Sequence, residues 1–414
     1  MFQSLKETDS QTYNFIQQEQ RRQREELQMI PSENYASRAV LAPLSTVLCN
    51  KYSEGYPGRR YYRGNKIIDG LEELTIDRVK KLFSSEYANV QPLSGTQANI
   101  AVYLAFLKPG DKILSMELSA GGHFSHGYAI NFTGQFYQLA SYGVNRGTEQ
   151  LDYDEIQKIA EREQPKLIIA GASAYPRIID FSRFAQIARS VKAFLMADIA
   201  HIAGLVAAGE HPSPVPMADV VTLTTHKTLR GPRGGVILAS RKYARRLDKA
   251  VFPGGVQGGP HNHVHAAKAV CFKEAFSPLF KDYARQIIKN SQQLAADLLE
   301  KNYRLVSGGT DNHLLLIDLR NKGIDGCEAS LALEKAGIIV NKNMIPFDPG
   351  TPKRPSGIRL GTPALTTRGM KEKDMEQIVG WFNEVLENIQ NEKRLTQIKN
   401  EIKKYAEKFP LPGV

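Results

Sequence analysis

The sequence predicts an α/β fold, in which a mostly parallel sheet has helices on both faces and a smaller C-terminal α+β domain follows. Apolar strand-like runs alternate with helical periodicity from about residue 66 onward. Strands interleaved with helices favour a parallel sheet that is covered on both faces. The 414 residues suggest two or three domains, and 42% hydrophobic with 23% charged residues is an ordinary globular composition.

The expected elements follow in a regular order. A polar amphipathic helix, capped near Asp9 or Ser10, precedes the alternating region. Strands are expected at 87–92, 111–116, 166–171, 194–198, 219–226 and 234–240, with helices at 67–83, after 94–96 and at 181–191. A long helical segment from about 265 to 301 precedes strands at 304–309 and 313–319, helices at 326–336 and 371–390, and a solvated helix near the C-terminus. These elements indicate an N-terminal arm at 1–45, a large domain at 46–275 and a small domain at 276–414.

The net charge and the cysteine content limit the kinds of ligand and the cellular compartment that we expect for this protein. Lys and Arg outnumber Asp and Glu by 54 to 43, which favours anionic ligands or a nucleic-acid surface. The three cysteines form no C-x-x-C pair, so neither a disulfide framework nor a zinc site is expected. The most apolar window contains Lys192, Asp198 and His201, which excludes a membrane span. With no signal-peptide core at the N-terminus, we expect a cytoplasmic protein.

Lys227 lies in "TLTTHKTLRGPRGG", close to His226, Arg230 and Arg233. A lysine among other cations is held in a field that disfavours its charged form, which is one route to the nucleophilic amine that a Schiff base requires. The alternative is a surface turn with solvated charges. P-loop, H-E-x-x-H, G-x-S-x-G and G-x-G-x-x-G patterns are absent, so the chemistry must depend on a different set of residues.

Two further stretches fit the binding of an anionic, aromatic ligand. "SGTQAN" sets Ser94, Gly95 and Thr96 at the start of a helix, where free amides and the helix dipole attract phosphate. Asp198 ends an apolar strand and could keep a pyridinium nitrogen protonated, while His201 follows three residues later. A plain helix cap is the alternative explanation for either stretch.

Several other polar stretches are candidates. His123 follows two glycines in "SAGGHFSHG" and could stack on an aromatic ring, and "KYSEGYPGRRYYRG" is a loop rich in tyrosine and arginine. Arg359 between glycines suits a bidentate grip on a carboxylate. Glycine-rich turns, a solvated loop and a surface salt bridge are the alternatives. "HNHVH" at 261–265 adjoins a helical segment, so no metal site is expected there.

Taken in order, these stretches resemble the serine hydroxymethyltransferase family, pyridoxal-phosphate enzymes of the aspartate-aminotransferase fold type. The resemblance covers nearly the whole chain, through "PSENYAS", "KYSEGYPGRRYY", "SGTQAN", "GGHFSHG", "SAYPRIIDF", "DIAHIAGLVAAG", "THKTLRGPRGG", "SGGTDNH" and "SGIRLGTPA". It implies reversible transfer of the serine hydroxymethyl group to tetrahydrofolate, which leaves glycine and methylenetetrahydrofolate. "FPGGVQGGP" has one residue more than the family's usual spacing.

The resemblance also implies a cofactor site. Lys227 would bind pyridoxal phosphate as a Schiff base, Asp198 would pair with the pyridinium nitrogen, and His123 would stack on the ring. Further residues would contact the cofactor phosphate or ring hydroxyl: Ser94, Gly95, Thr96, Ser173, His201 and His226.

Substrate residues are implied in the same way. Arg359 and Ser32 would hold the substrate carboxylate. A neighbouring subunit would supply Tyr52, Tyr62 and the acid/base group Glu54, so a homodimer, or a tetramer built from it, is expected. Glu54 would also contact folate, together with Leu118, Gly122, Phe124 and Asn343.

Two rival functions remain open at this point. A folate-independent aldolase for threonine-like amino acids is the nearest, although the Glu54 loop and "SAGGH" favour the folate enzyme. An RNA-binding protein is suggested by the pI near 9.3. It is disfavoured because no RNA-binding motif is present and the basic residues are dispersed.

Overall fold

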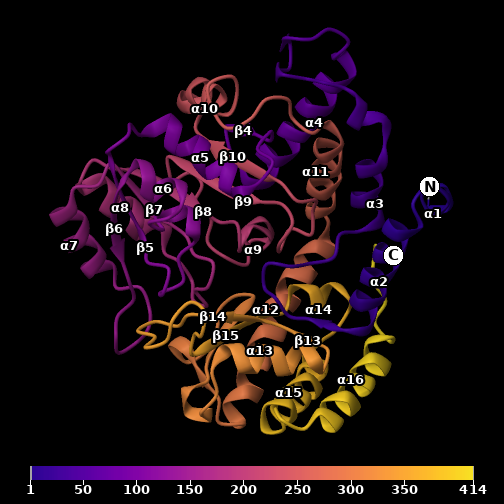
Figure 1. Ribbon diagram of the computed structural model, residues 1–414. Coiled ribbons are helices and arrows are strands. Elements are labelled where there is room, and N and C mark those ends of the chain that lie inside the picture. The colour runs from indigo at the N-terminus through magenta and orange to yellow at the C-terminus, as the bar shows by residue number, and fades with distance from the viewer. Residues whose placement is uncertain (1, 414) are drawn as a thin grey trace.

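A seven-stranded sheet organises the larger part of the molecule in the computed structural model, which describes residues 2–413. The strands are β4 (Tyr87–Asn89), β5 (Lys112–Met116), β6 (Gln138–Tyr142), β7 (Leu167–Ala170), β8 (Phe194–Asp198), β9 (Val220–Thr224) and β10 (Gly235–Ala239). Their order is β4-β10-β9-β8-β7-β5-β6, and β10 alone runs opposite to the other strands, since it pairs antiparallel with both β9 and β4. The predicted fold class is therefore confirmed (Figure 1). Strand β6 was not expected, because most of its side chains are exposed at the sheet edge and show no buried pattern.

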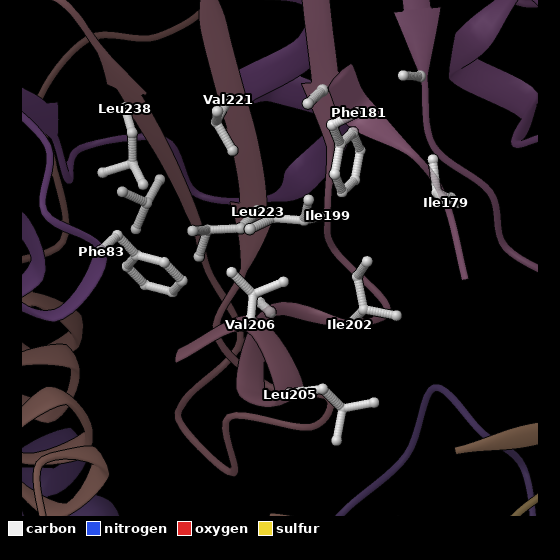
Figure 2. Close-up of a cluster of buried hydrophobic side chains, with 14 of the residues drawn as sticks. Phe83, Ile179, Phe181, Ile199, Ile202, Leu205, Val206, Val221, Leu223 and Leu238 are labelled. Carbon is white, nitrogen blue, oxygen red and sulfur yellow. The ribbon is translucent and has the colours of Figure 1, made fainter. Parts of the chain in front are cut away.

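Helices cover both faces of this sheet because successive strand residues point in opposite directions. The flanking helices are α4 (Lys66–Phe83), α5 (Gly95–Phe106), α7 (Tyr153–Glu163), α8 (Phe181–Ser190), α9 (Ala203–Ala208) and α10 (Ala244–Val251). On β7, Leu167 and Ile169 join the core under α5 and α10, whereas Ile168 and Ala170 join the core of the opposite face. Figure 2 shows part of this opposite core, where side chains of β9 and β10 meet those of α9.

The C-terminal part forms a second sheet with its own core. Its strands lie in the order β11 (Arg304–Leu305), β12 (Leu314–Asp318), β15 (Gly357–Gly361) and β14 (Asn341–Asn343), all antiparallel. Helix α13 (Gly326–Lys335) packs against this sheet, and α15 (Glu372–Glu387) and α16 (Glu392–Ala406) contribute to the same core. The strand β15, which carries Arg359, was not expected as a separate element. The division into an arm and two domains stays a prediction.

The N-terminal segment packs against these C-terminal elements. Helix α2 (Ser10–Glu25) begins after Asp9, whose side chain accepts from the Thr12 amide at 2.9 Å, as predicted. Strand β1 (Leu27–Gln28) pairs with β13 (Ile338–Ile339), and α2 lies beside α16 (Figure 1). The Arg368 guanidinium donates to carbonyls after both helices, including Glu26 at 2.9 Å and Phe409 at 2.8 Å. One side chain thus satisfies the ends of two helices.

The prediction of one long helical segment from about 265 to 301 is wrong in one respect, because two separate helices occupy this region. They are α11 (Asn262–Ala275) and α12 (Pro278–Glu300). Ser277 caps α12 by accepting from the Phe280 amide at 3.2 Å, and Pro278 occupies the first helical position. Proline has no amide hydrogen to continue a preceding helix, so the chain turns here.

The remaining elements are short. They are α1 (Phe2–Thr8), α3 (Arg38–Leu41), β2 (Gly55–Tyr56), β3 (Arg59–Arg60), α6 (Phe132–Phe136), α14 (Pro363–Thr367) and 3-10 turns at 42–45, 47–50, 124–126, 241–243, 306–308 and 320–322. Over residues 2–413, no helix combines the length and the apolar character that crossing a membrane requires.

Candidate active site

A cavity of about 530 Å³ lies where the carboxyl ends of the parallel strands meet the C-terminal sheet. Ligands of open α/β sheets bind at this edge. The cavity brings together most of the predicted site residues: Ser32, Ser94, Gly95, Thr96, Leu118, Gly122, His123, Phe124, Ser173, Asp198, His201, His226, Lys227, Asn343 and Arg359. It does not include Tyr52, Glu54 or Tyr62.

Lys227 follows β9 and is 9% exposed. Burial lowers the pKa of its amine to about 8, and the charges of Arg359 and Arg233 act in the same direction, whereas Asp198 opposes them. Arg230 is not among the charges that lower the pKa of Lys227. Its guanidinium lies over the Tyr283 ring instead, 3.9 Å from the ring centre. The predicted depression of the lysine pKa thus has burial as its main cause rather than the adjacent arginines.

Asp198 ends β8 and presents a carboxylate that is held in place on both oxygens. Oδ2 accepts from Asn99 Nδ2 at 2.9 Å and pairs with His126 Nε2 at 2.8 Å, while Oδ1 accepts from the Ala200 amide. Burial alone would raise the pKa of Asp198. The hydrogen bonds and the charge of His126 outweigh burial and hold this pKa well below its usual range.

Three histidines of the cavity are held neutral. Burial lowers the pKa of His123 to about 4 and that of His226 to about 3, and it holds the pKa of His201 well below its ordinary value. The charges of Lys227 and nearby groups reinforce burial in each case. Neutral imidazoles can stack on a ring or exchange a single hydrogen bond without adding charge.

The N-terminus of α5 opens into the same cavity. Ser94 is the N-cap, and its hydroxyl accepts from the Gln97 amide at 3.2 Å. A β-carbon on Gly95 would lie 2.7 Å from Thr224 Cγ2, so glycine lets the helix start close to β9. The first amides of a helix have no intrahelical acceptor, and together with the dipole they bind phosphate.

Arg359 reaches the cavity from β15, on the C-terminal sheet. Its guanidinium donates to the Ser173 carbonyl at 2.5 Å and to Asn341 Oδ1 at 3.1 Å. Burial lowers the pKa of Arg359 to about 10, and no carboxylate of residues 2–413 contributes to that shift. A buried guanidinium without an acidic partner suits an anionic ligand, because a ligand carboxylate would supply the missing charge.

The loop with Tyr52, Glu54 and Tyr62 lies away from this cavity. The rings of Tyr52 and Tyr62 meet edge to face with centroids 5.3 Å apart, and 56% and 47% of these side chains are exposed. Glu54 lies beside Gly258, and Tyr52 beside Gly259. A single chain therefore does not bring these three residues together with Lys227.

Sequence reasoning missed Asn99 and His126, which hold Asp198. Asn99 stands one helical turn after Gly95 on α5, so its spacing from the predicted phosphate loop was a usable signal. His126 follows His123 across a 3-10 turn, and nothing in the sequence links it to Asp198, 72 residues away.

A family model described as serine hydroxymethyltransferase matches residues 5–382. The chain belongs to the serine hydroxymethyltransferase family. Among curated relatives, the serine hydroxymethyltransferase of Acidobacterium capsulatum is 57% identical over 410 residues, which cover 99% of this chain and 96% of the relative. The serine hydroxymethyltransferase of Acidothermus cellulolyticus is 52% identical over 417 residues, with 99% and 97% covered.

As a serine hydroxymethyltransferase, the chain is a pyridoxal-phosphate-dependent transferase that interconverts serine and glycine with tetrahydrofolate as co-substrate. The predicted function, enzyme class and cofactor are confirmed, and neither the aldolase nor the RNA-binding alternative is favoured. The cavity fits this cofactor on its own chemistry. A buried amine, an ionised carboxylate and a helix N-terminus with a close-packed glycine all line one space.

The lowered lysine pKa predicts how this serine hydroxymethyltransferase takes up its cofactor. Only the neutral amine is a nucleophile, and with a pKa of about 8 its fraction rises as the pH increases toward 8. We expect the rate constant for pyridoxal phosphate uptake by the apoprotein to rise about tenfold per pH unit below that pH and to level off above it. Stopped-flow absorbance at fixed ionic strength measures this rate. If the rate constant kept rising with pH up to about pH 10.4, Lys227 would be an ordinary, solvated lysine.

Proposed function

We propose that the cavity around Lys227 is the site of hydroxymethyl transfer. The observation that carries this proposal is the convergence on one cavity of a buried amine, a buried ionised carboxylate and a buried guanidinium that has no acidic partner among residues 2–413. Lys227 attaches the cofactor, Asp198 holds a proton on the pyridine nitrogen, and neutral His123 stacks on the ring. The phosphate and ring hydroxyl are bound by the residues that share that part of the cavity: Ser94, Gly95, Thr96, Ser173, His201 and His226.

The substrate groups follow from the other wall of the cavity. Arg359 binds the amino-acid carboxylate, with Ser32 beside it, because this guanidinium has only neutral acceptors of its own. This contact orients the Cα substituent for reaction. Bound pyridoxal phosphate supplies a protonated ring that accepts the electron pair released at Cα. The folate ring is assigned to the part of the cavity lined by Leu118, Gly122, Phe124 and Asn343, where Phe124 is 54% exposed.

A second copy of the chain completes this site in our proposal. Tyr52, Glu54 and Tyr62 are too remote from the Lys227 cavity to act in their own chain, as their absence from its lining indicates. Exposed apolar side chains in the same region support a homodimer interface, since Val47 is 78% and Ile67 is 77% exposed. In this arrangement Glu54 moves the proton of the substrate hydroxyl.

We also propose a cytoplasmic location, which is supported by three free cysteines.

The carboxylate assignment is tested with the Arg359→Lys variant. Lysine keeps the charge but loses the planar pair of donors, so we expect the KM for serine to rise about 100-fold or more. The affinity for pyridoxal phosphate should change little. Initial rates of glycine formation from serine and tetrahydrofolate measure the first effect, and equilibrium dialysis measures the second. An unchanged KM for serine would contradict the assignment of Arg359.

A further inference from the structure

We propose that His313 is a positioning residue that fixes the proton of His201 and so makes His201 a hydrogen-bond donor to the ligand. This inference rests on the proposed function, in which His201 faces the ring hydroxyl of the cofactor. His313 begins the approach to β12 on the C-terminal sheet and does not line the Lys227 cavity. It contacts His201, which does line that cavity.

The contact is a hydrogen bond between two buried imidazoles. His201 Nδ1 lies 3.2 Å from His313 Nε2, and the two side chains are 6% and 0% exposed. Burial lowers the pKa of His313 to about 3, and the charges of Arg359 and Lys227 lower it further. Both rings are therefore neutral, and each carries one hydrogen, on either of its nitrogens.

Only one of the two possible arrangements avoids a buried, unpaired donor. His313 Nδ1 is closed off from solvent and has no hydrogen-bond partner among residues 2–413. If His201 Nδ1 donated, the hydrogen of His313 would sit on Nδ1 and remain unpaired. If His313 Nε2 donates, Nδ1 keeps only an unpaired lone pair. Orphaned buried N–H groups are the rarer defect in folded proteins, so His313 Nε2 is the donor.

The consequence reaches the cavity through His201. With Nδ1 as the acceptor, the single hydrogen of His201 lies on Nε2, the nitrogen that is free to face the ligand. A donor at this position favours an ionised ring oxygen over a neutral hydroxyl, because a hydrogen bond to a charged acceptor is the stronger one. His313 thereby sets the charge state of the bound cofactor without touching it.

The surroundings keep His313 in this orientation. The neighbouring Asn312 donates from Nδ2 to the Tyr175 carbonyl at 3.0 Å and accepts from the Leu314 amide at 3.1 Å. The His313 carbonyl accepts from the Thr362 amide at 3.1 Å. The ring is thus placed by the backbone on both sides, as expected of a group that orients another.

The direct test reads the tautomers by nitrogen NMR. Protein labelled with ¹⁵N-histidine, without cofactor, is measured at a pH where both rings are neutral, and the signals are assigned with His201→Gln and His313→Gln variants. We expect the hydrogen on Nε2 in both His201 and His313. A hydrogen on Nδ1 of His201 would overturn the proposal. Because no cofactor is present, this result does not depend on the proposed function.

Two substitutions at His313 test the consequence in the holoenzyme. Gln extends an amide N–H to about the position of Nε2, whereas Leu fills the space without a donor. We expect His313→Leu to weaken pyridoxal phosphate binding about tenfold and to shift the pH at which the visible cofactor band changes, with His313→Gln within about twofold of the native protein.

His211 provides the matched control, because it is a buried histidine close to His313 that makes no hydrogen bond to His201. His211→Gln should leave the cofactor band and its pH dependence unchanged. Equal effects of the Gln and Leu variants at His313 would indicate packing alone and overturn the positioning role. A native protein that binds no cofactor would instead contradict the proposed function.

Discussion

Lys227→Ala is expected to abolish covalent attachment of pyridoxal phosphate and to lower kcat by at least about 10⁴-fold. The physical reason is that Lys227 supplies a buried amine whose pKa of about 8 leaves a large neutral fraction at neutral to mildly alkaline pH. No other amine of the cavity is buried, because Lys342, the remaining lysine in its lining, is exposed. Losses of this size are typical when a nucleophile that acts with other groups is removed.

The measurement is mass spectrometry after borohydride reduction, which fixes the cofactor to the amine that holds it. Lys268→Met is the matched control, because Lys268 is also buried and burial lowers its pKa to about 7. Its ammonium donates to three carbonyls, including Val90 at 2.6 Å and Gly235 at 2.9 Å, and it does not line the cavity. The control should retain the cofactor mass on Lys227. A cofactor mass that persists in Lys227→Ala would exclude this residue as the attachment point.

The order of strands and helices was predictable because buried elements require apolar residues at regular positions in the sequence. Strands β7, β8 and β9 are buried on both faces, so their sequences are largely apolar and rich in β-branched or aliphatic residues. Strand β6 escaped prediction because an edge strand needs no such run. The break between α11 and α12 was predictable in principle, since a capping serine followed by proline is a helix start signal that the sequence contains at Ser277 and Pro278.

The site was predictable to the extent that local sequence carries its chemistry. Lys227, Asp198 and Arg359 each stand at a strand end or beside glycines, and the cavity collects all three. Long-range partners were not predictable. The contacts of Asp198 with His126 and of His201 with His313 join residues 72 and 112 positions apart. Only the fold decides such pairs, and a histidine in a sequence carries no sign of the group that will face it.

Glu54→Gln is expected to lower kcat for folate-dependent transfer about 10²- to 10⁴-fold and to leave cofactor binding unchanged. The amide keeps the size of the side chain but can no longer accept a proton. A 10²- to 10⁴-fold loss of rate is about what removal of a general acid or base causes. Glu73→Gln is the matched control, because Glu73 is an exposed carboxylate on the nearby helix α4. Initial rates with serine and tetrahydrofolate measure the effect. Unchanged transfer in Glu54→Gln would remove this residue from the mechanism.

Mixing two inactive variants decides which subunit supplies Glu54. If Glu54 acts in the partner's site, a heterodimer of Lys227→Ala and Glu54→Gln contains one site with both native residues and one site with neither. If Glu54 acts in its own chain, every site of that heterodimer lacks one of them. Random pairing of co-expressed subunits makes about half of the dimers mixed, so the first case restores about one quarter of native activity. Because the Lys227 cavity of a single chain lacks Glu54, we expect restoration. An affinity tag on each variant shows which dimers are mixed. If these mixed dimers have no restored activity, the acid/base group must lie elsewhere.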